Sequence, residues 1–271
     1  MEQPDLNPGH GPQQDRPDTA LPQPSEDTQG DPALPADVPD LQSPPSPTPQ
    51  PLAVDADRLG LHGRERWVFR EVGVRLPVGA VLAVIGAKGS GRSSLLLTLA
   101  GRMRATDGRL SVLGYSLPRQ ARQVRERAAV ARVGRAVALE PGLTVAETVR
   151  ERSLLDVVSP DLAAERFGWA CSVLGLDLHG HGLVEDLSGL EQTQLACAVA
   201  AVGAPSLLLL DDVDAGLHSH EESAVWRGLR GLADSGVSVV AATTDPGPAG
   251  EHCDAVLRLA PAVETTKGHF R

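Results

Sequence analysis

Short apolar runs alternate with stretches of helical periodicity between about residue 53 and residue 260. The apolar runs are almost uninterrupted in aliphatic residues, which is typical of strands that are buried on both faces of a sheet. The stretches between them repeat apolar residues every three to four positions, which predicts helices that cover such a sheet. This order of elements predicts the α/β class, with a mostly parallel sheet flanked by helices.

Individual strands and helices follow from the same pattern. The segment 67–76 alternates polar and apolar residues, as an edge strand of a hairpin does. The other predicted strands are the buried runs 80–86, 128–133, 206–212 and 237–245. The predicted helices cover 93–103, 145–190 with breaks at 159–160 and 179–182, 190–203 and 220–236.

Residues 1–52 differ in composition from the rest of the chain. The first 51 residues contain 14 of the 22 prolines, many acids and no aromatic residue. Such a segment buries too little apolar surface to offset the entropy cost of ordering it, so we expect a disordered tail. Its PxxP spacings also suit a proline-binding groove, although a solvated tail is the simpler interpretation. We predict one folded domain at 53–262 and a flexible end at 263–271.

Acidic residues are concentrated at the same end of the chain. Residues 1–58 hold eleven acids and two arginines, and thus −9 of the net charge of −10. The nearly neutral remainder offers no broad basic field, so nucleic acid is not an expected partner. The three cysteines are odd in number and widely spaced, which predicts neither a disulfide nor a metal site. Without a basic leader or a run of about 20 apolar residues, neither export nor membrane insertion is expected.

A glycine-rich run, GAKGSGRSS at 86–94, follows a predicted buried strand and opens a predicted helix. In such a turn successive backbone N–H groups converge on phosphate oxygens, at the positive end of the helix that follows. Ser93 falls where a hydroxyl ligates Mg²⁺, whereas Arg92 stands where the pattern G-x-x-x-x-G-K-[ST] has lysine. Taken alone, the run also fits an ordinary glycine-rich turn between strand and helix.

Downstream motifs carry a family resemblance. From Leu187 the chain reads LSGLEQTQLACAVAAVGAPSLLLLDDVDAGLH, which resembles the ATP-binding cassette of ABC transporters. That family has LSGGQ, a helix, an apolar strand ending in Asp-Glu, and a loop of the type SALD, and the step of 24 positions from Leu187 to Asp211 matches its spacing. PGLTVAETV at 141–149 and AATTD at 241–245 resemble two further segments of the cassette.

The resemblance extends over about residues 57–260 and implies a P-loop NTPase fold of ABC type. It implies a mostly parallel sheet flanked by helices, an antiparallel β edge, and a helical subdomain at about 145–190. It also implies ATP and Mg²⁺ as cofactors. The positions that match the family's site residues are Gly86, Ala87, Lys88, Gly89, Ser90, Gly91, Arg92, Ser93, Ser94, Ser188 and Gly189 for ATP, Ser93 and Asp211 for Mg²⁺, and Asp212, Arg135 and Thr244 for catalysis.

The catalytic motifs all depart from the family pattern. Asp212 is one methylene shorter than the family's glutamate, and a misplacement of about 1 Å can cost about a hundredfold in rate. Thr244 replaces a histidine and cannot reach as far, and Arg135 stands at the glutamine position, where its charge repels a metal or clamps a phosphate. Arg92 keeps a positive charge but not the compact shape of an ammonium. The remaining departures are Leu190 and Glu191 in the signature and His218 in the loop after the last aspartates.

These features favour an ATP-binding transporter subunit on the cytoplasmic face of the membrane, with a separate permease and a second cassette as partners. Hydrolysis is expected to be weak. The alternative is a catalytically inactive cassette that regulates or scaffolds a partner cassette, and a weaker one is a cassette protein outside transport. Lys88 could supply the missing ammonium, although a solvent-facing side chain is the simpler interpretation, and Trp67 is a candidate to stack on adenine.

Overall fold

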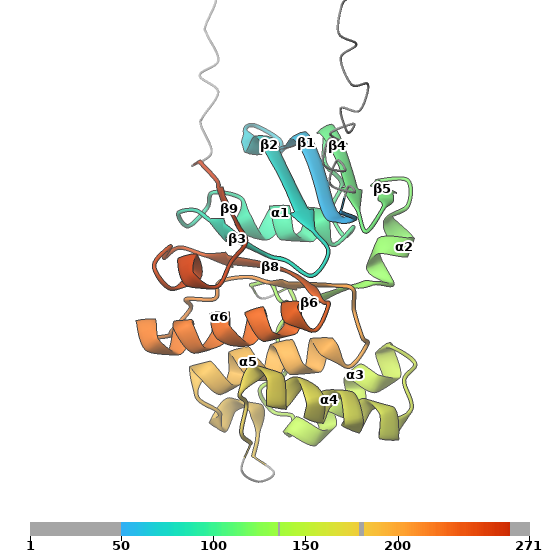
Figure 1. Ribbon diagram of the computed structural model, residues 1–271, viewed down its shortest axis with the longest axis vertical. Helices are drawn as coiled ribbons and strands as arrows, with labels where there is room; N and C mark the ends of the chain where they lie inside the picture. Colours follow the sequence, from blue (N-terminus) through green and yellow to red (C-terminus); the bar gives the residue numbers. More distant parts are fainter. Residues whose placement is uncertain (1–49, 135, 179–181, 261–271) are drawn as a thin grey trace, which may run out of the picture. The chain divides into compact units, whose positions relative to one another are not determined.

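The computed structural model describes residues 50–134, 136–178 and 182–260. Most of the predicted N-terminal tail, the whole of the predicted C-terminal end and the catalytic candidate Arg135 lie outside these residues, as does most of the predicted break at 179–182. The described residues form an antiparallel sheet and a parallel sheet, with helices between and beneath them (Figure 1). This arrangement confirms the predicted α/β class with an antiparallel β edge.

The antiparallel sheet has the strand order β2-β1-β4-β5. The edge strand predicted for 67–76 is β2, and it pairs with β1 as a hairpin. Of the four strands, β1, β4 and β5 were not predicted. The bounds are Leu52–His62 for β1, Trp67–Pro77 for β2, Asp107–Val112 for β4 and Tyr115–Leu117 for β5.

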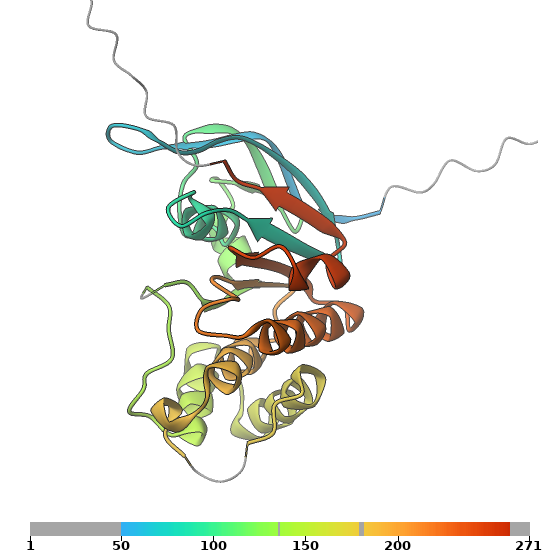
Figure 2. The same cartoon turned by 90° about the vertical axis from the view of Figure 1, so that its left-hand side faces the viewer.

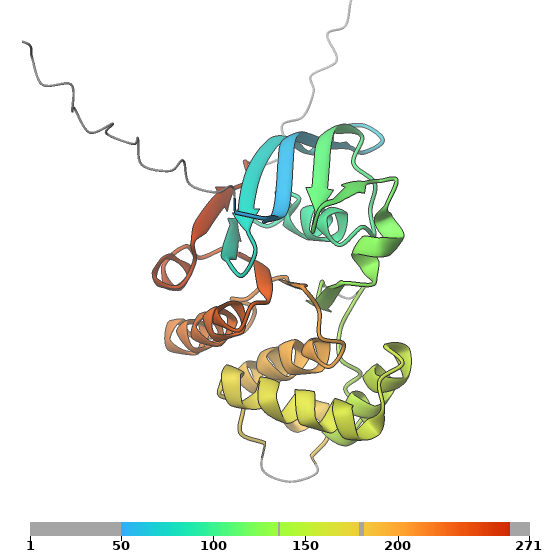
Figure 3. The same ribbon diagram turned by 45° about the vertical axis from the view of Figure 1, so that its right-hand side comes forward.

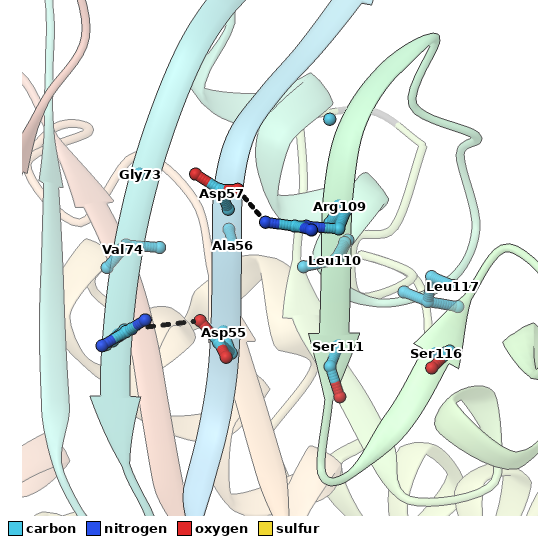
Figure 4. Close-up of a pocket in the computed structure, with 12 residues that line it drawn as sticks. Asp55, Ala56, Asp57, Gly73, Val74, Arg109, Leu110, Ser111, Ser116 and Leu117 are labelled. Carbon is cyan, nitrogen blue, oxygen red and sulfur yellow. Dashed lines mark hydrogen bonds and ion pairs between the residues drawn. The ribbon is translucent and has the colours of Figure 1, made fainter.

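A hollow of about 910 Å³ lies on the outer face of this sheet (Figure 4). Ion pairs cross it between neighbouring strands: Asp57 Oδ2 lies 2.6 Å from Arg109 Nη2, and Asp55 Oδ1 lies 3.4 Å from Arg75 Nε. These charged groups already form ion pairs with one another across the sheet, so they are not left over for a ligand.

The parallel sheet has the strand order β6-β7-β8-β3-β9. Its first four members confirm the predicted buried runs, whereas β9 was not predicted. All four leucines of β7 are fully buried, and burying a leucine side chain stabilises a fold by about 1.5–3 kcal/mol. The bounds are Val81–Ile85 for β3, Ala128–Arg132 for β6, Leu207–Leu210 for β7, Ser238–Thr243 for β8 and Ala255–Arg258 for β9.

Helices cover both faces of the parallel sheet. α1 lies between the two sheets, α5 and α6 cover the opposite face, and α3 and α4 lie beyond them (Figures 1 and 2). In β3, Leu82 and Val84 therefore enter the core around α1, while Val81, Ala83 and Ile85 enter the core with α5 and α6. The helix bounds are Arg92–Leu99 for α1, Ala121–Arg125 for α2, Val145–Leu155 for α3, Pro160–Leu174 for α4, Gly189–Ala201 for α5 and Ser219–Asp234 for α6, with 3-10 turns at Val184–Asp186 and Pro248–Glu251.

The predicted helical stretch 145–190 corresponds to α3, α4 and the 3-10 turn that precedes α5, and Figure 3 shows this layer at the end of the molecule opposite the antiparallel sheet. The predicted break at 159–160 is the N-terminus of α4, where Ser159 caps the helix and Pro160 begins it. Among the described residues, no helix combines the length and apolar character that crossing a membrane requires.

The helix predicted for 93–103 ends earlier than expected. α1 stops at Leu99, and Gly101 then adopts a left-handed conformation with a φ of 66°. The N–H of Arg102 donates to the carbonyl of Leu97 at 2.9 Å, which closes the last turn. A glycine in this conformation is a common helix terminator, because residues with a Cβ avoid it.

Candidate functional site

Three neighbouring parallel strands end at the same edge of the sheet. β3 pairs with β8, with Ile85 opposite Thr243, and β8 pairs with β7, with Ala241 opposite Leu210. The glycine-rich loop after β3, the segment after β8 and the aspartates after β7 therefore lie together, although more than 100 residues separate the first from the last. The carboxyl edge of a parallel sheet is where such folds bind ligands.

Crowding, backbone conformation or both favour glycine at three positions of the loop. Gly91 has a φ of 93°, and a Cβ added to it would lie 2.5 Å from the carbonyl oxygen of Val68. A Cβ on Gly86 would lie 2.4 Å from Ser90 Oγ. Gly89 has a φ of 83° but open space around it, so only its conformation favours glycine there.

The loop leads into the N-terminus of α1, which no side chain caps. Gly91 occupies the N-cap position, and the first turn of the helix holds no acidic residue. The unpaired N–H groups of a helix's first turn carry partial positive charge and attract anions. Ser90 Oγ and Arg92 Nη1 are also buried, and neither has a hydrogen-bond partner among the described residues. These donors suit a phosphate group.

Arg92, whose side chain is buried, forms an ion pair across the site. Its Nη2 donates to Asp212 Oδ1 at 2.7 Å, and its side chain is 8% exposed against 42% for that of Asp212. Arg92 replaces the lysine of the family's loop, and Asp212 replaces its glutamate. These two substituted residues thus contact one another. Sequence spacing could not reveal this pair, because 120 positions separate its members.

Ser93 and Asp211 meet beside this pair. Ser93 Oγ donates to Asp211 Oδ2, and the backbone N–H of Asp212 donates to Asp211 Oδ1 at 3.0 Å. Asp211 is fully buried, and burial raises the pKa of its carboxyl above the usual value. A hydroxyl and a carboxylate at this position fit Mg²⁺, which completes its coordination with water and phosphate oxygens. The described residues contain no cluster of three or more His, Cys, Asp or Glu that could hold a metal alone.

A pocket of about 480 Å³ joins these elements. It gathers most of the predicted phosphate-loop residues with two of the predicted catalytic positions, and it adds three residues that the sequence did not single out. Its lining consists of Val68, Lys88, Gly89, Gly91, Arg92, Ser93, Ser94, Asp212, Asp214, Ala215 and Thr244. Lys88 is exposed and also lines the pocket, so both of its interpretations stay open.

Two residues with clear roles in this geometry were missed. Asp214 accepts hydrogen bonds from Thr244 Oγ1 and, at 3.1 Å, from the N–H of Thr244. Arg132, at the end of β6, donates to the carbonyl of Asp212 at 2.7 Å and to Thr193 Oγ1 at 2.9 Å. Two features of the sequence could have indicated them: Asp214 is the third aspartate of DDVDAG, and Arg132 is the charged last residue of a buried apolar run.

Ser188 and Gly189 do not line the pocket. They begin α5, where Ser188 Oγ accepts from the N–H of Glu191 at 3.2 Å and Glu191 Oε2 accepts from the N–H of Ser188 at 2.8 Å. This capping box satisfies the start of the helix with its own side chains. Trp67 is likewise absent from the pocket lining, and its ring packs edge-on against His62 with centroids 5.0 Å apart.

A glycine-rich loop between a parallel strand and a helix, with a serine next to a strand-end aspartate, defines a phosphate-loop nucleotide-binding fold. Comparison with known families agrees with this class. The family model described as "ABC transporter" matches residues 69–215, more than half of the 271 residues. The chain belongs to the ABC transporter family, as one of its ATP-binding cassettes, which confirms the resemblance seen in the sequence.

Curated relatives and a solved structure extend this match. The daunorubicin/doxorubicin resistance ATP-binding protein DrrA of Streptomyces peucetius is 29% identical over 170 residues, which cover 63% of this chain and 51% of that protein. The hemin import ATP-binding protein HmuV of Gloeobacter violaceus is 31% identical over 218 residues, 74% of this chain and 76% of that protein. The dimeric structure of MJ0796, a bacterial ABC transporter cassette, superposes with a TM-score of 0.63 at 18% identity, over 78% of this chain and 98% of that one. The chain spans about half the length of DrrA.

Proposed function

We propose that this chain is the nucleotide-binding subunit of an ABC-type transporter, that it binds Mg-ATP at Gly86–Ser94, and that it hydrolyses ATP slowly. The single observation that carries the proposal is the pocket itself. A glycine at position 91 that has no room for a Cβ, an uncapped helix start and two buried donors with no partner among the described residues all belong to this one loop and the helix start that follows it. An anionic, multiply charged ligand satisfies all three features.

The phosphates and the Mg²⁺ of the nucleotide have candidate partners in this chain. Backbone N–H groups of the loop and the start of α1 would hold the phosphates, and Arg92 Nη1 would donate to one of their oxygens. Ser93 and Asp211 would hold Mg²⁺, which when bound neutralises phosphate charge. The assignment of Ser188 and Gly189 to ATP of a second cassette stays a prediction.

Slow hydrolysis follows from the partners that the predicted catalytic side chains already have. Asp212 is paired with Arg92, and Thr244 donates to Asp214. Phosphoryl transfer depends mainly on positioning and electrostatic stabilisation, so a water-orienting carboxylate that is held elsewhere contributes little. Asp212 has a shorter side chain than the family's glutamate, and Thr244 a shorter one than its histidine. Each would have to leave its present partner to act on a nucleotide.

A groove on the outer helices supports the proposed coupling to a permease. A volume of about 730 Å³ lies between α3 and α4, with Leu154 and Leu155 at 72% exposure and Val157 at 91% close by. Val157 has a φ of 55°, a conformation that β-branched residues rarely adopt. We infer that a short amphipathic helix of the permease occupies this groove on the cytoplasmic side, because exposed apolar side chains of this size favour a partner. Its lining includes Val145, Val149, Leu154, Val158, Pro160, Ala163 and Phe167.

One observation favours the alternative, a catalytically inactive cassette that regulates a partner cassette. Glu191 places a carboxylate at the start of α5, where the family's signature approaches the triphosphate of the opposite subunit. An anion there repels a second anion. A homodimer built on two such surfaces is weaker than a heterodimer in which the partner supplies an intact signature.

Calorimetric titration of the purified chain with Mg-ATP, together with a phosphate-release assay, tests the proposal. We expect binding at submillimolar ATP, release far below that of a competent cassette, and loss of binding in Ser93→Ala. Ser111→Ala, on the outer face of the antiparallel sheet, is the matched control and keeps full affinity. Absence of binding at millimolar ATP rejects the proposal, and fast release that Asp212→Asn abolishes rejects slow hydrolysis. Transport by a reconstituted complex that survives Ser93→Ala supports the regulatory alternative.

A further inference from the structure

The ion pair with Asp212 uses one of the two outer nitrogens of the Arg92 guanidinium. Nη2 of Arg92 is bound to Asp212 Oδ1, whereas the buried Nη1 has no partner among the described residues. A free guanidinium grips a phosphate with two parallel donors. Here one of the two outer nitrogens is already used by a carboxylate of the same chain.

The backbone holds Asp212 in this position. Its φ of 47° lies in the left-handed region, which aspartate tolerates at some cost. Arg132 Nη2 donates to the backbone carbonyl of Asp212 at 2.7 Å, and the backbone N–H of Asp212 donates to Asp211 Oδ1 at 3.0 Å. Strained residues persist where several contacts determine them, and they concentrate at functional sites. The carboxylate of Asp212 is therefore presented to Arg92 by a fixed loop.

A second carboxylate lines the same pocket. Asp214, held by Thr244, lies with Asp212 among the lining residues, while the cationic groups Lys88 and Arg92 belong to the glycine-rich loop. A ligand phosphate on the loop side meets N–H donors and positive charge. An additional phosphate that extends toward Asp212 and Asp214 meets negative charge.

We propose, on the basis of the nucleotide binding inferred for this loop, that Asp212 is an internal counter-ion that competes with the terminal phosphate of a nucleotide for Arg92. The pocket therefore takes a nucleoside diphosphate in preference to a triphosphate. A diphosphate uses the loop N–H groups and Nη1 and leaves the ion pair intact. A triphosphate has to displace Asp212 from a charge-assisted hydrogen bond, and loses about tenfold or more in affinity by doing so.

Calorimetric titration of the full chain with ADP and with the non-hydrolysable triphosphate AMP-PNP, both with Mg²⁺, measures this preference without interference from turnover. We expect ADP to bind at least about tenfold more tightly than AMP-PNP. Asp212→Asn removes the competing charge, so AMP-PNP affinity rises about tenfold while ADP affinity changes little. A water-activating role for Asp212 predicts no such gain in affinity for a ligand that cannot be hydrolysed.

Asp245→Asn is the matched control, because Asp245 is exposed, follows β8 and does not line the pocket. It removes one negative charge from the same edge of the sheet and leaves both affinities unchanged. Arg92→Gln provides a second variant: because it removes the cation for which Asp212 competes, adding Asp212→Asn to it produces little further gain. Equal or tighter binding of AMP-PNP by the wild type, or an unchanged preference in Asp212→Asn with a native circular dichroism spectrum, overturns the inference. Binding of neither nucleotide by any variant rejects the proposed function instead.

Discussion

The N-termini of α1 and α5 are the two helix starts that the family resemblance assigns to nucleotide, and they are built differently. α1 begins after Gly91 with no capping side chain and no acid in its first turn. α5 begins with Ser188 and Glu191 in a reciprocal capping box. The partial positive charge of a helix start is thus left available at α1 and is neutralised by the chain's own carboxylate at α5.

A third helix shows what the difference means. α3 begins with Thr144 and Glu147 in the same kind of box, with contacts of 2.8 and 3.2 Å that equal those at α5. No motif assigns the start of α3 to a ligand, so this geometry is that of a helix stabilised by its own side chains. By this comparison α1 retains what phosphate binding needs, whereas α5 has the construction of an ordinary helix start.

Changing Gly91 to alanine is expected to have the largest effect on the α1 side of this comparison. The new Cβ would lie 2.5 Å from the carbonyl oxygen of Val68 at a φ of 93°, so the loop must move. We expect nucleotide binding to be lost and the free energy of unfolding to fall by about 2 kcal/mol or more. Calorimetric titration and urea denaturation measure the two effects.

Gly89→Ala is the control for this change. Gly89 has a similar φ of 83°, but a Cβ there would meet nothing within 4 Å. It should cost only the conformational strain, about 1–2 kcal/mol, and weaken nucleotide binding less. Equal losses of binding in the two variants would mean that conformation, and not the close approach of Val68, makes glycine necessary at position 91.

Much of this α1 side was predictable from sequence. Buried parallel strands are uninterrupted aliphatic runs, so β3, β7 and β8 and the loop between β3 and α1 were located by pattern and spacing. The strands β4, β5 and β9 were missed because they are short and carry charged or half-exposed residues, as in DGRLSV at 107–112. β1 was missed although it has 11 residues, because charged residues interrupt its apolar positions, as in VDADR at 54–58.

The side-chain partnerships within the site could not be predicted. Arg92 meets Asp212 and Arg132 reaches the carbonyl of Asp212 only because the strand order places β6 and β7 beside each other, with β8 between β7 and β3. Local spacing indicates which residues end a strand, but it does not give the order of strands in the sheet. The substitutions at 92 and 212 therefore look like independent losses in the sequence and form one ion pair in the fold.

Ser188→Ala tests the α5 side, with a smaller expected effect. If Ser188 serves as an ordinary helix cap, its loss lowers the free energy of unfolding by about 1 kcal/mol, as does Thr144→Ala at α3. Nucleotide affinity of the isolated chain stays unchanged in both variants, because neither residue lines the pocket. Urea denaturation of the two variants under the same conditions gives the comparison. A neutral or stabilising Ser188→Ala, beside a destabilising Thr144→Ala, would assign Ser188 to function and break the parallel between the two helices.

The smallest expected effect is a pH dependence at the start of α3. The backbone N–H and the hydroxyl of Thr144 donate to Glu147 and lower the pKa of its carboxyl below the usual value of 4.5. A lowered pKa in the folded state means that the unfolded chain binds the proton more readily, so stability falls as the pH falls. The contribution of Glu147 to the free energy of unfolding is complete at a pH above the pKa of this carboxyl in the unfolded chain. It is lost as the pH drops through the pKa of the carboxyl in the folded protein.

In Glu147→Gln this contribution is absent, so the stability curves of variant and wild type should be separated near neutral pH and converge in acid. Because other acids titrate equally in both proteins, the difference between the curves isolates this cap, and a constant separation down to strong acid would contradict the assignment. Glu191→Gln measured in the same way shows whether the carboxylate at α5 responds to acid as this ordinary cap does.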